Sequence, residues 1–331
     1  MSQAEAGLRV QRAVEACLAD LPSDAPILVA VSGGADSLAL ARAAARLDRP
    51  ISVGIIDHRL QPDSDAVARR AAEMCAHLGI EGVYVEPVVV SEVGTGPEAA
   101  ARDARRAALE SMADRLGASV ILLGHTRDDQ AETVLLRLAR GSGARALAAM
   151  APIAGRWRRP LLDIPRDVVR ASVADLPTWE DPHNADPAYA RTRVRQDALP
   201  VLVDALGPDV VVGLSRSARL LRDDADALDE IAAQAALSLT ASDGTVDAEG
   251  LLLLPRAVRT RVIRGAILAA GCPGSALTSS HIERVESLVT AWRGQGPVDL
   301  PGGLAAGRSY GRLAFYRVPP VADRRRVNRE E

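Results

Sequence analysis

The fold is decided by the stretch ILVAVSGGADS at residues 27–37. Its first five residues are continuously apolar and mostly β-branched, which is typical of a strand buried on both faces of a parallel sheet. Apolar residues then recur at helical spacing from Leu38 to Leu47, so residues 32–37 form the turn between a strand and a helix. Adjacent glycines let the backbone approach a ligand, and the free N–H groups of a helix start attract anions. The sequence predicts a phosphate-binding turn; a glycine turn capped by Asp36 and Ser37 is the plain alternative.

This turn differs from the common phosphate loop, which needs a lysine, because the chain contains no lysine at all. Asp36 stands at the helix start and is predicted to bind Mg²⁺ or to lie near the reacting phosphorus. The string SGGADS resembles the loop of the N-type ATP pyrophosphatases, which cleave ATP between the α and β phosphates. On that resemblance, the residues expected to hold ATP are Ser32, Gly33, Gly34, Ala35, Asp36 and Ser37.

The composition of the 331-residue chain predicts a two-domain protein with a sizeable core, since 48% of its residues are hydrophobic. All 40 basic residues are arginines, which suit phosphate contacts and base stacking, although a GC-rich genome would give the same bias. Three scattered cysteines indicate neither a disulfide framework nor a zinc site. With no signal peptide or membrane span recognisable, we expect a soluble, cytoplasmic protein with no membrane partner.

Strands and helices alternate as far as Gly143, with further strands expected at 51–56, 82–90 and 120–123. The predicted fold is therefore α/β, with a doubly wound, mainly parallel sheet that binds its ligand at the carboxyl ends of the strands. Beyond Gly143 the sequence predicts a loop at 176–190, helices at 191–206, 209–239, 256–270 and 281–292, and a hairpin ending near Tyr316. We expect a catalytic domain at 1–207, a smaller, mainly helical domain at 208–318 with a long linking helix, and a disordered tail at 319–331.

Polar residues cluster where two of these strands end. Asp57 and His58 follow the strand at 51–56, where a base or ribose would lie, unless they only form a strand-end turn. The stretch GHTRDDQAET at 124–133 follows the strand at 120–123. His125 is predicted to contact phosphate or a transferred proton. Carboxylates at the start of the next helix can bind Mg²⁺ or an ammonium group, or can simply cap the helix; they are Asp128, Asp129 and Glu132.

Arginines gather at three other places. Arg102 and Arg105 share a helix face, and the stretch RLARGSG at 137–143 is a basic glycine turn that contains Arg140. The segment 179–195 combines aromatic residues with alternating arginines, which is how unpaired RNA bases are held, although a solvated basic helix would look the same. Its predicted RNA contacts are Trp179, Tyr189, Arg191, Arg193 and Arg195.

Taken together, these motifs resemble the tRNA(Ile)-lysidine synthetases. Two residues depart from the family pattern: Arg106 replaces an aromatic residue, and Thr192 replaces an asparagine. The blocks that carry the resemblance are SGGADS (32–37), IDHRLQPDS (56–64), AARDARR (100–106), LGHTRDDQAETVLLRLARGSG (123–143), RPLL (159–162), WEDPHNADPAYARTRVRQDALPVL (179–202), LPRAVRTRVIR (254–264) and LPGGLAAGRSYGRLAFY (300–316).

The resemblance implies a ligase that joins L-lysine to carbon 2 of the wobble cytidine in the CAU anticodon of tRNA(Ile). ATP first adenylates the cytidine and releases pyrophosphate; lysine then displaces AMP, and codon reading changes from AUG to AUA. The implied cofactors are ATP and Mg²⁺, and a homodimer is left open. The implied catalytic residues are Asp36, Arg105, His125, Asp128, Asp129 and Glu132, and the implied tRNA contacts add Arg102 and Arg140 to the segment 179–195.

Three alternatives remain at this point. Synthesis of 2-thiocytidine in tRNA shares the loop but needs cysteine pairs, which the sequence lacks. A small-molecule amidating ligase is disfavoured by the arginine-rich second half. A nucleotide- or RNA-binding module without turnover would not need the carboxylates that follow both strands.

Overall fold

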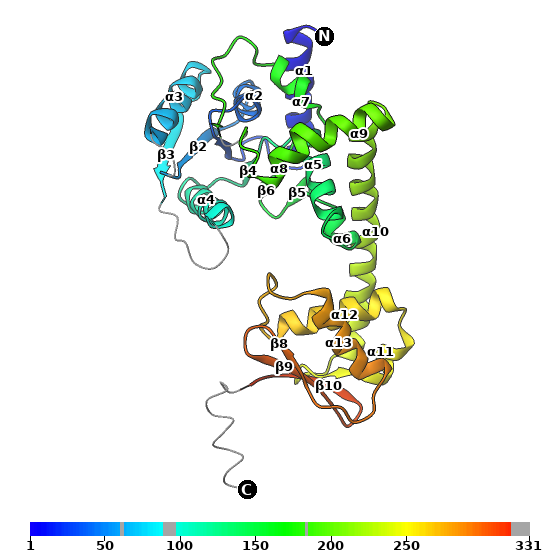
Figure 1. The fold of residues 1–331 in the computed structure, drawn as a ribbon. Coiled ribbons are helices and arrows are strands. Elements are labelled where there is room, and N and C mark those ends of the chain that lie inside the picture. Colours follow the sequence, from blue (N-terminus) through cyan, green and yellow to red (C-terminus); the bar gives the residue numbers. More distant parts are fainter. Residues whose placement is uncertain (60–62, 89–96, 183–184, 319–331) are drawn as a thin grey trace. The chain divides into compact units, whose positions relative to one another are not determined.

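The computed structural model describes residues 1–59, 63–88, 97–182 and 185–318 (Figure 1). It divides into two compact units, Met1–Arg222 and Asp223–Glu331. The division falls inside helix α10 (Val210–Leu239) and not at the expected position 207/208, because this unbroken helix serves both units. Arg222 donates a hydrogen bond to Ala148 in the first unit, and Ala232 belongs to the core of the second. The tail expected to be disordered, 319–331, lies outside the described residues.

The first unit contains a six-stranded sheet. All neighbouring strands are parallel except the last pair, which confirms the mainly parallel sheet. The last two strands were not predicted, because each has two residues and one lies in the arginine-rich stretch GRWRRP at 155–160. The order is β3 (Gly82–Pro87), β2 (Ile51–Asp57), β1 (Ile27–Val31), β4 (Val120–Leu122), β6 (Trp157–Arg158) and β5 (Ile153–Ala154).

Helices cover both faces of this sheet (Figure 1). The expected helices are present with ends shifted by a few residues, whereas the short α6 and α7 were not predicted. In chain order they are α1 (Gln3–Cys17), α2 (Ala35–Ala44), α3 (Ser64–His77), α4 (Pro97–Arg115), α5 (Arg127–Leu138), α6 (Ala144–Leu147), α7 (Arg166–Ala171), α8 (Ala190–Arg193), the π-helical turn η2 (Val194–Ala198) and α9 (Leu199–Leu206).

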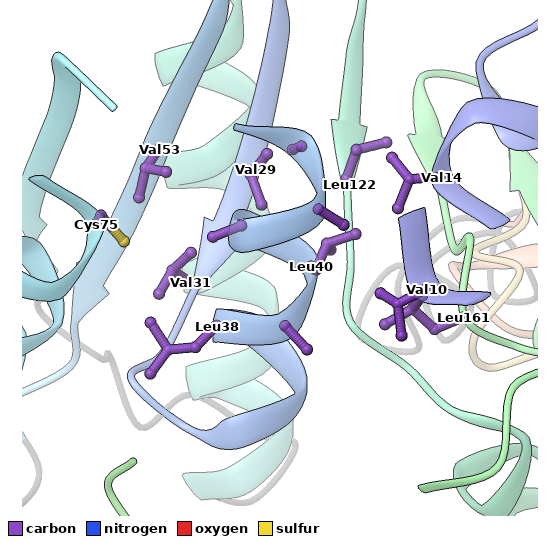
Figure 2. Packing of buried hydrophobic residues seen from close by; sticks show 14 of the residues in the cluster. Val10, Val14, Val29, Val31, Leu38, Leu40, Val53, Cys75, Leu122 and Leu161 are labelled. Carbon is purple, nitrogen blue, oxygen red and sulfur yellow. The ribbon is translucent and has the colours of Figure 1, made fainter. Parts of the chain in front are cut away.

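Strand β1 supplies both faces of the core because alternate side chains of a strand point to opposite sides. Ile27, Val29 and Val31 pack in the cluster formed with α1, α2, α3 and α7. Figure 2 shows this side, with Val31 near Leu38 of α2, and with Val10 and Val14 of α1 near Leu161 and Leu122. Leu28 and Ala30 pack on the other face against α4. The fully buried strand predicted at 27–31 is confirmed.

The sheet order also locates the crevice. From β1 the chain runs through α2 to β2 on one side, while β4 pairs with β1 on the other. In doubly wound sheets, ligands bind outside the carboxyl ends of the strands at such a reversal. The turn after β1 and the stretch after β4 are both at this edge.

The second unit is a small α/β body. Its four-stranded antiparallel sheet has the order β7 (Val246–Asp247), β10 (Arg312–Arg317), β9 (Leu304–Ser309) and β8 (Val298–Leu300). The expected hairpin is β9–β10, and the expected helices are α12 (Arg256–Ala269) and α13 (Ser279–Thr290). The short elements β7, β8 and α11 (Ala248–Leu253) were not predicted. More of the described residues are helical than extended, as expected for this unit.

No single helix among the described residues is long and apolar enough to cross a membrane. Ala190–Leu206 and Val210–Leu239 reach that limit only when the two are counted together across a bend of 100°.

Candidate active site

The turn after β1 is closed by Ser37. Its hydroxyl accepts a hydrogen bond from the backbone N–H of Ser32 at 3.2 Å and donates one to the carbonyl of Gly34 at 2.9 Å. Gly33 has φ +85°, a conformation that glycine adopts without strain, and Gly34 is the N-cap of α2. The predicted strand, turn and helix therefore exist, and the start of α2 opens on the carboxyl edge of the sheet.

Trp179 lies against this turn. Its backbone N–H donates to the carbonyl of Gly33 at 3.0 Å, and a Cβ atom added to Gly33 would lie 3.8 Å from the Cβ of Trp179. The structure thus brings Trp179 to the phosphate-binding turn. Its predicted contact with tRNA stays a prediction.

Asp36 has a carboxylate oxygen, Oδ1, that no described residue hydrogen-bonds. This atom is buried. Burial, together with the negative charge of Asp129, raises the pKa of Asp36 to about 6. A buried carboxylate oxygen with a raised pKa is suited to receive a cation.

The surroundings of Asp36 fit Mg²⁺ carried by a nucleotide. Among the described residues, no group of three or more acidic, histidine or cysteine side chains could hold a metal ion. Mg²⁺ is usually bound by one or two carboxylates together with substrate phosphates and water. Asp36 can supply such a carboxylate beside the phosphate-binding turn.

Gly124 sets the position of Asp36 because β4 leaves the sheet directly against the start of α2. A Cβ atom added to Gly124 would lie 2.8 Å from the carbonyl oxygen of Asp36, a contact closer than real Cβ atoms make. We expect Gly124→Ala to displace Asp36 and to lower ATP turnover by roughly 10²-fold. Steady-state AMP formation measures this, with Gly143→Ala as the control because a Cβ atom there meets nothing within 4 Å. Full activity of Gly124→Ala would contradict the packing argument.

The two predicted histidines are half-buried and electrically neutral near pH 7. Burial is the main cause that lowers the pKa of His125 to about 3; Arg159, Arg191 and Arg105 lower it further against the opposing effect of Asp129. The pKa of His58 is also lowered, by burial and by Arg105. The Nδ1 atoms of both rings have no hydrogen-bond partner within the chain. The two rings are thus available for neutral hydrogen bonds with a ligand, and a cationic contact of His125 with phosphate is not favoured.

Asp129 and Glu132 accept hydrogen bonds from the same three arginines. Glu132 is fully buried and accepts hydrogen bonds from Arg166 at 2.9 Å, from Arg191 at 2.8 Å and from Arg195 at 2.8 and 3.1 Å. Asp129 accepts from Arg166 at 2.8 Å, from Arg191 at 3.0 Å and from Arg195 at 3.4 Å.

Positive charge outweighs negative charge in this five-residue group. Although burial opposes ionisation, the neighbouring arginines hold the pKa values of Asp129 and Glu132 below their ordinary range. Asp128 is not part of the group: its carboxylate accepts the backbone N–H of Arg166 at 2.8 Å and so holds the start of α7.

The remaining predicted site residues lie as follows. Asp57 is buried and accepts the backbone N–H of Arg59 at 3.0 Å. Arg193 donates to the carbonyls of Pro187 and Ala188, away from the carboxylates that hold Arg191 and Arg195. Arg102 and Arg140 are exposed, and Arg105 and Tyr189 are half-buried.

Arg166 is the site residue that the sequence analysis missed. It occupies the first turn of α7, where the helix dipole disfavours a cation, and its contacts with Asp129 and Glu132 compensate for this. A basic residue directly after Pro165 was the available signal. Of the two family departures, Arg106 pairs with Glu110 and lies over the ring of Trp157 at 4.8 Å. Thr192 is buried.

Comparisons with known proteins identify the family of the chain. The sequence matches the PP-loop domain family over residues 7–202 and the TilS substrate binding domain over residues 247–314. It is 53% identical to the tRNA(Ile)-lysidine synthase of Thermobifida fusca, with 92% of this chain and 95% of the relative covered. It is 51% identical to that of Streptomyces coelicolor, with 89% and 86% covered.

Among solved structures, the U34-tRNA thiolase NcsA of Methanococcus maripaludis is similar in fold. Its TM-score is 0.54 at 20% identity, covering 64% of this chain and 78% of the thiolase. The strand-turn-helix at 27–44, the carboxylates after β4 and these two family matches lead to one conclusion: the chain belongs to the tRNA(Ile)-lysidine synthase family.

Proposed function

We propose that this protein joins L-lysine to carbon 2 of the wobble cytidine of tRNA(Ile) with anticodon CAU, at the expense of ATP. The observation that carries the proposal is the buried Oδ1 atom of Asp36, which no described residue hydrogen-bonds, beside the phosphate-binding turn in a chain of this family. In the first step, oxygen 2 of the cytosine attacks the α phosphorus, and the bond to the β phosphate breaks. In the second step, the ε-amine of lysine attacks carbon 2, and AMP leaves with the oxygen.

The residues of the chain can be assigned to parts of this reaction. The amides and hydroxyls of residues 32–37 hold the phosphates of ATP, and Asp36 binds Mg²⁺, which neutralises charge on the phosphates when it is bound. Neutral His125 and His58 offer hydrogen bonds to the nucleotide. The lowered pKa values of Asp129 and Glu132 disfavour their accepting the proton of lysine; the two carboxylates instead hold Arg166, Arg191 and Arg195 at the edge of the crevice.

Lysine incorporation tests the proposal. With radiolabelled lysine, ATP and Mg²⁺, we expect label in tRNA(Ile) with anticodon CAU and none when the wobble cytidine is replaced. The label should survive mild alkali, which removes ordinary aminoacyl esters. Label that does not depend on the cytidine, or that alkali removes, would refute lysidine formation.

Thiolation is not favoured as an alternative. The cysteines lie in separate elements, at Cys17, Cys75 and Cys272. Cys75 belongs to the core, and burial raises the pKa of its thiol to about 11. Such a thiol is a poor sulfur carrier, because the reactive form is the thiolate.

A further inference from the structure

A second group of arginines lies beside the catalytic edge, and two of its members, Arg137 and Arg159, have no role in the assignments above. Its members are Arg102 and Arg105 of α4, Arg137 at the end of α5, Arg140 just beyond it, and Arg159 in the RPLL block after β6. We call these five residues the arginine cluster. Among the side chains that the structure describes, no carboxylate forms an ion pair with any of them, in contrast to Arg166, Arg191 and Arg195.

Main-chain carbonyls hold part of the cluster in place. Arg137 donates to the carbonyl of Ala146, and Arg159 donates to that of Ala151 at 2.9 Å. The same segment is fixed to α5 by Gln130, whose side chain exchanges two hydrogen bonds with the backbone of Met150 at 2.9 and 3.0 Å. Carbonyl groups orient a guanidinium without neutralising it, so the cluster is a fixed concentration of positive charge.

The charges are close enough to disturb one another. Burial, followed by repulsion from Arg102, lowers the pKa values of Arg105, Arg137 and Arg159, that of Arg159 to about 10. The Nε atom of Arg159 is buried and has no hydrogen-bond acceptor. A bound anion would reduce the repulsion between these arginines. It would also accept a hydrogen bond from the Nε atom of Arg159.

The position of the cluster indicates which anion. Arg159 directly follows β6, and the backbone N–H of Leu123, just after β4, donates to the carbonyl of Arg158 at 2.9 Å, so this part of the cluster lies at the catalytic edge. Arg140 lies beyond the far end of α5, and a helix of 12 residues is about 18 Å long. Charges that extend from this edge past the end of α5 suit successive phosphates of a polymer better than a compact triphosphate, for which the turn after β1 is already proposed.

We propose that the arginine cluster binds successive phosphodiester groups of the RNA strand next to the nucleotide in the catalytic crevice. The inference rests on the proposed function, because it takes the substrate to be RNA. It adds Arg137 and Arg159 to the RNA contacts, and it gives the RPLL block a role as the junction between the catalytic edge and the RNA backbone.

The test is the salt dependence of tRNA binding by two variants. Arg102→Gln with Arg140→Gln changes two exposed side chains, and Arg159→Gln removes the central charge. At physiological salt we expect each variant to bind the unmodified tRNA(Ile) transcript on the order of tenfold more weakly. The slope of log K against log salt should fall by about 0.7–0.9 for each arginine removed. The affinities for ATP and for pyrophosphate should not change.

The matched control is Arg9→Gln with Arg12→Gln, which removes two charges from exposed positions of α1. Thermal unfolding without RNA shows whether the variants fold, and Arg159→Gln should be no less stable because it removes repulsion. Weaker pyrophosphate or ATP binding with unchanged tRNA binding would overturn the proposal in favour of the triphosphate. An equal loss of tRNA binding in the α1 control would show that the effect depends only on net charge, and it would also overturn the proposal. Because binding is measured without lysine, failure of lysidine formation is a separate result.

Discussion

Asp36→Asn is expected to abolish AMP formation while tRNA still binds. The substitution keeps the size of the side chain but removes the charge beside the phosphate-binding turn, so the phosphates and Mg²⁺ lose their carboxylate partner. We expect the rate of AMP release to fall roughly 10²–10⁴-fold. A single-turnover assay with radiolabelled ATP measures it, and the exposed Asp48→Asn is the matched control. Turnover at the parental rate would remove Asp36 from the mechanism.

The same variant should be more stable than the parent at alkaline pH. The folded-state pKa of Asp36 is about 6, above its ordinary value of 3.8, so the folded protein binds this proton more tightly than the unfolded chain. The carboxylate therefore destabilises the fold progressively between about pH 4 and pH 6, and fully above pH 6. We expect Asp36→Asn to gain on the order of 1–3 kcal/mol at pH 8 in EDTA, and little at pH 4. Equal gains at both pH values would contradict this.

Glu132→Gln is expected to have the largest effect on stability. The fully buried carboxylate accepts hydrogen bonds from three half-buried arginines, and the amide that replaces it leaves their three positive charges facing Asp129 alone. Breaking a buried ion pair from one side costs about 3–5 kcal/mol. Urea denaturation at pH 7.5 measures the loss against the exposed control Glu81→Gln.

The pH dependence of the parent gives a second readout. Because the pKa of Glu132 is lowered in the folded state, its contribution is complete above the ordinary value near 4.5 and is lost as pH falls below it. The difference between parent and Glu132→Gln should therefore shrink in acid. An unfolding midpoint for the variant equal to the parent's at pH 7.5 would mean that the arginines do not depend on this carboxylate.

The sequence predicted those parts of the fold in which burial alone determines the residue types. The strand at 27–31 is apolar on both faces because α2 and α4 cover it from opposite sides. Two-residue strands such as Trp157–Arg158 could not be predicted, because two residues are too few to show a periodicity. Trp157–Arg158 is extended because it pairs with β4. The compact units divide inside α10, whereas the sequence offers a turn before that helix.

The residue types of the candidate site could be predicted from the sequence better than the pairs that these residues form. His125, Asp129 and Glu132 could be named because they follow a buried strand, where a doubly wound sheet opens. Their pairing could not, because Arg191 and Arg195 come to Asp129 and Glu132 from about sixty residues away along the chain. From sequence spacing alone, Arg191 and Arg195 were predicted to contact RNA. In the structure they already have Asp129 and Glu132 as carboxylate partners.

Because the partners of Asp129 and Glu132 are arginines, they do not compete with lysine for the activated cytidine. An activated cytidine is an electrophile, and any deprotonated amine within reach could be joined to it. Guanidinium groups stay protonated at every physiological pH, and carboxylate contact raises the pKa values of Arg166 and Arg191 further. A lysine at either position could lose its proton and compete as a nucleophile. In a chain without lysine, the ε-amine that reaches this site must come from the free amino acid, so self-modification by this route is excluded.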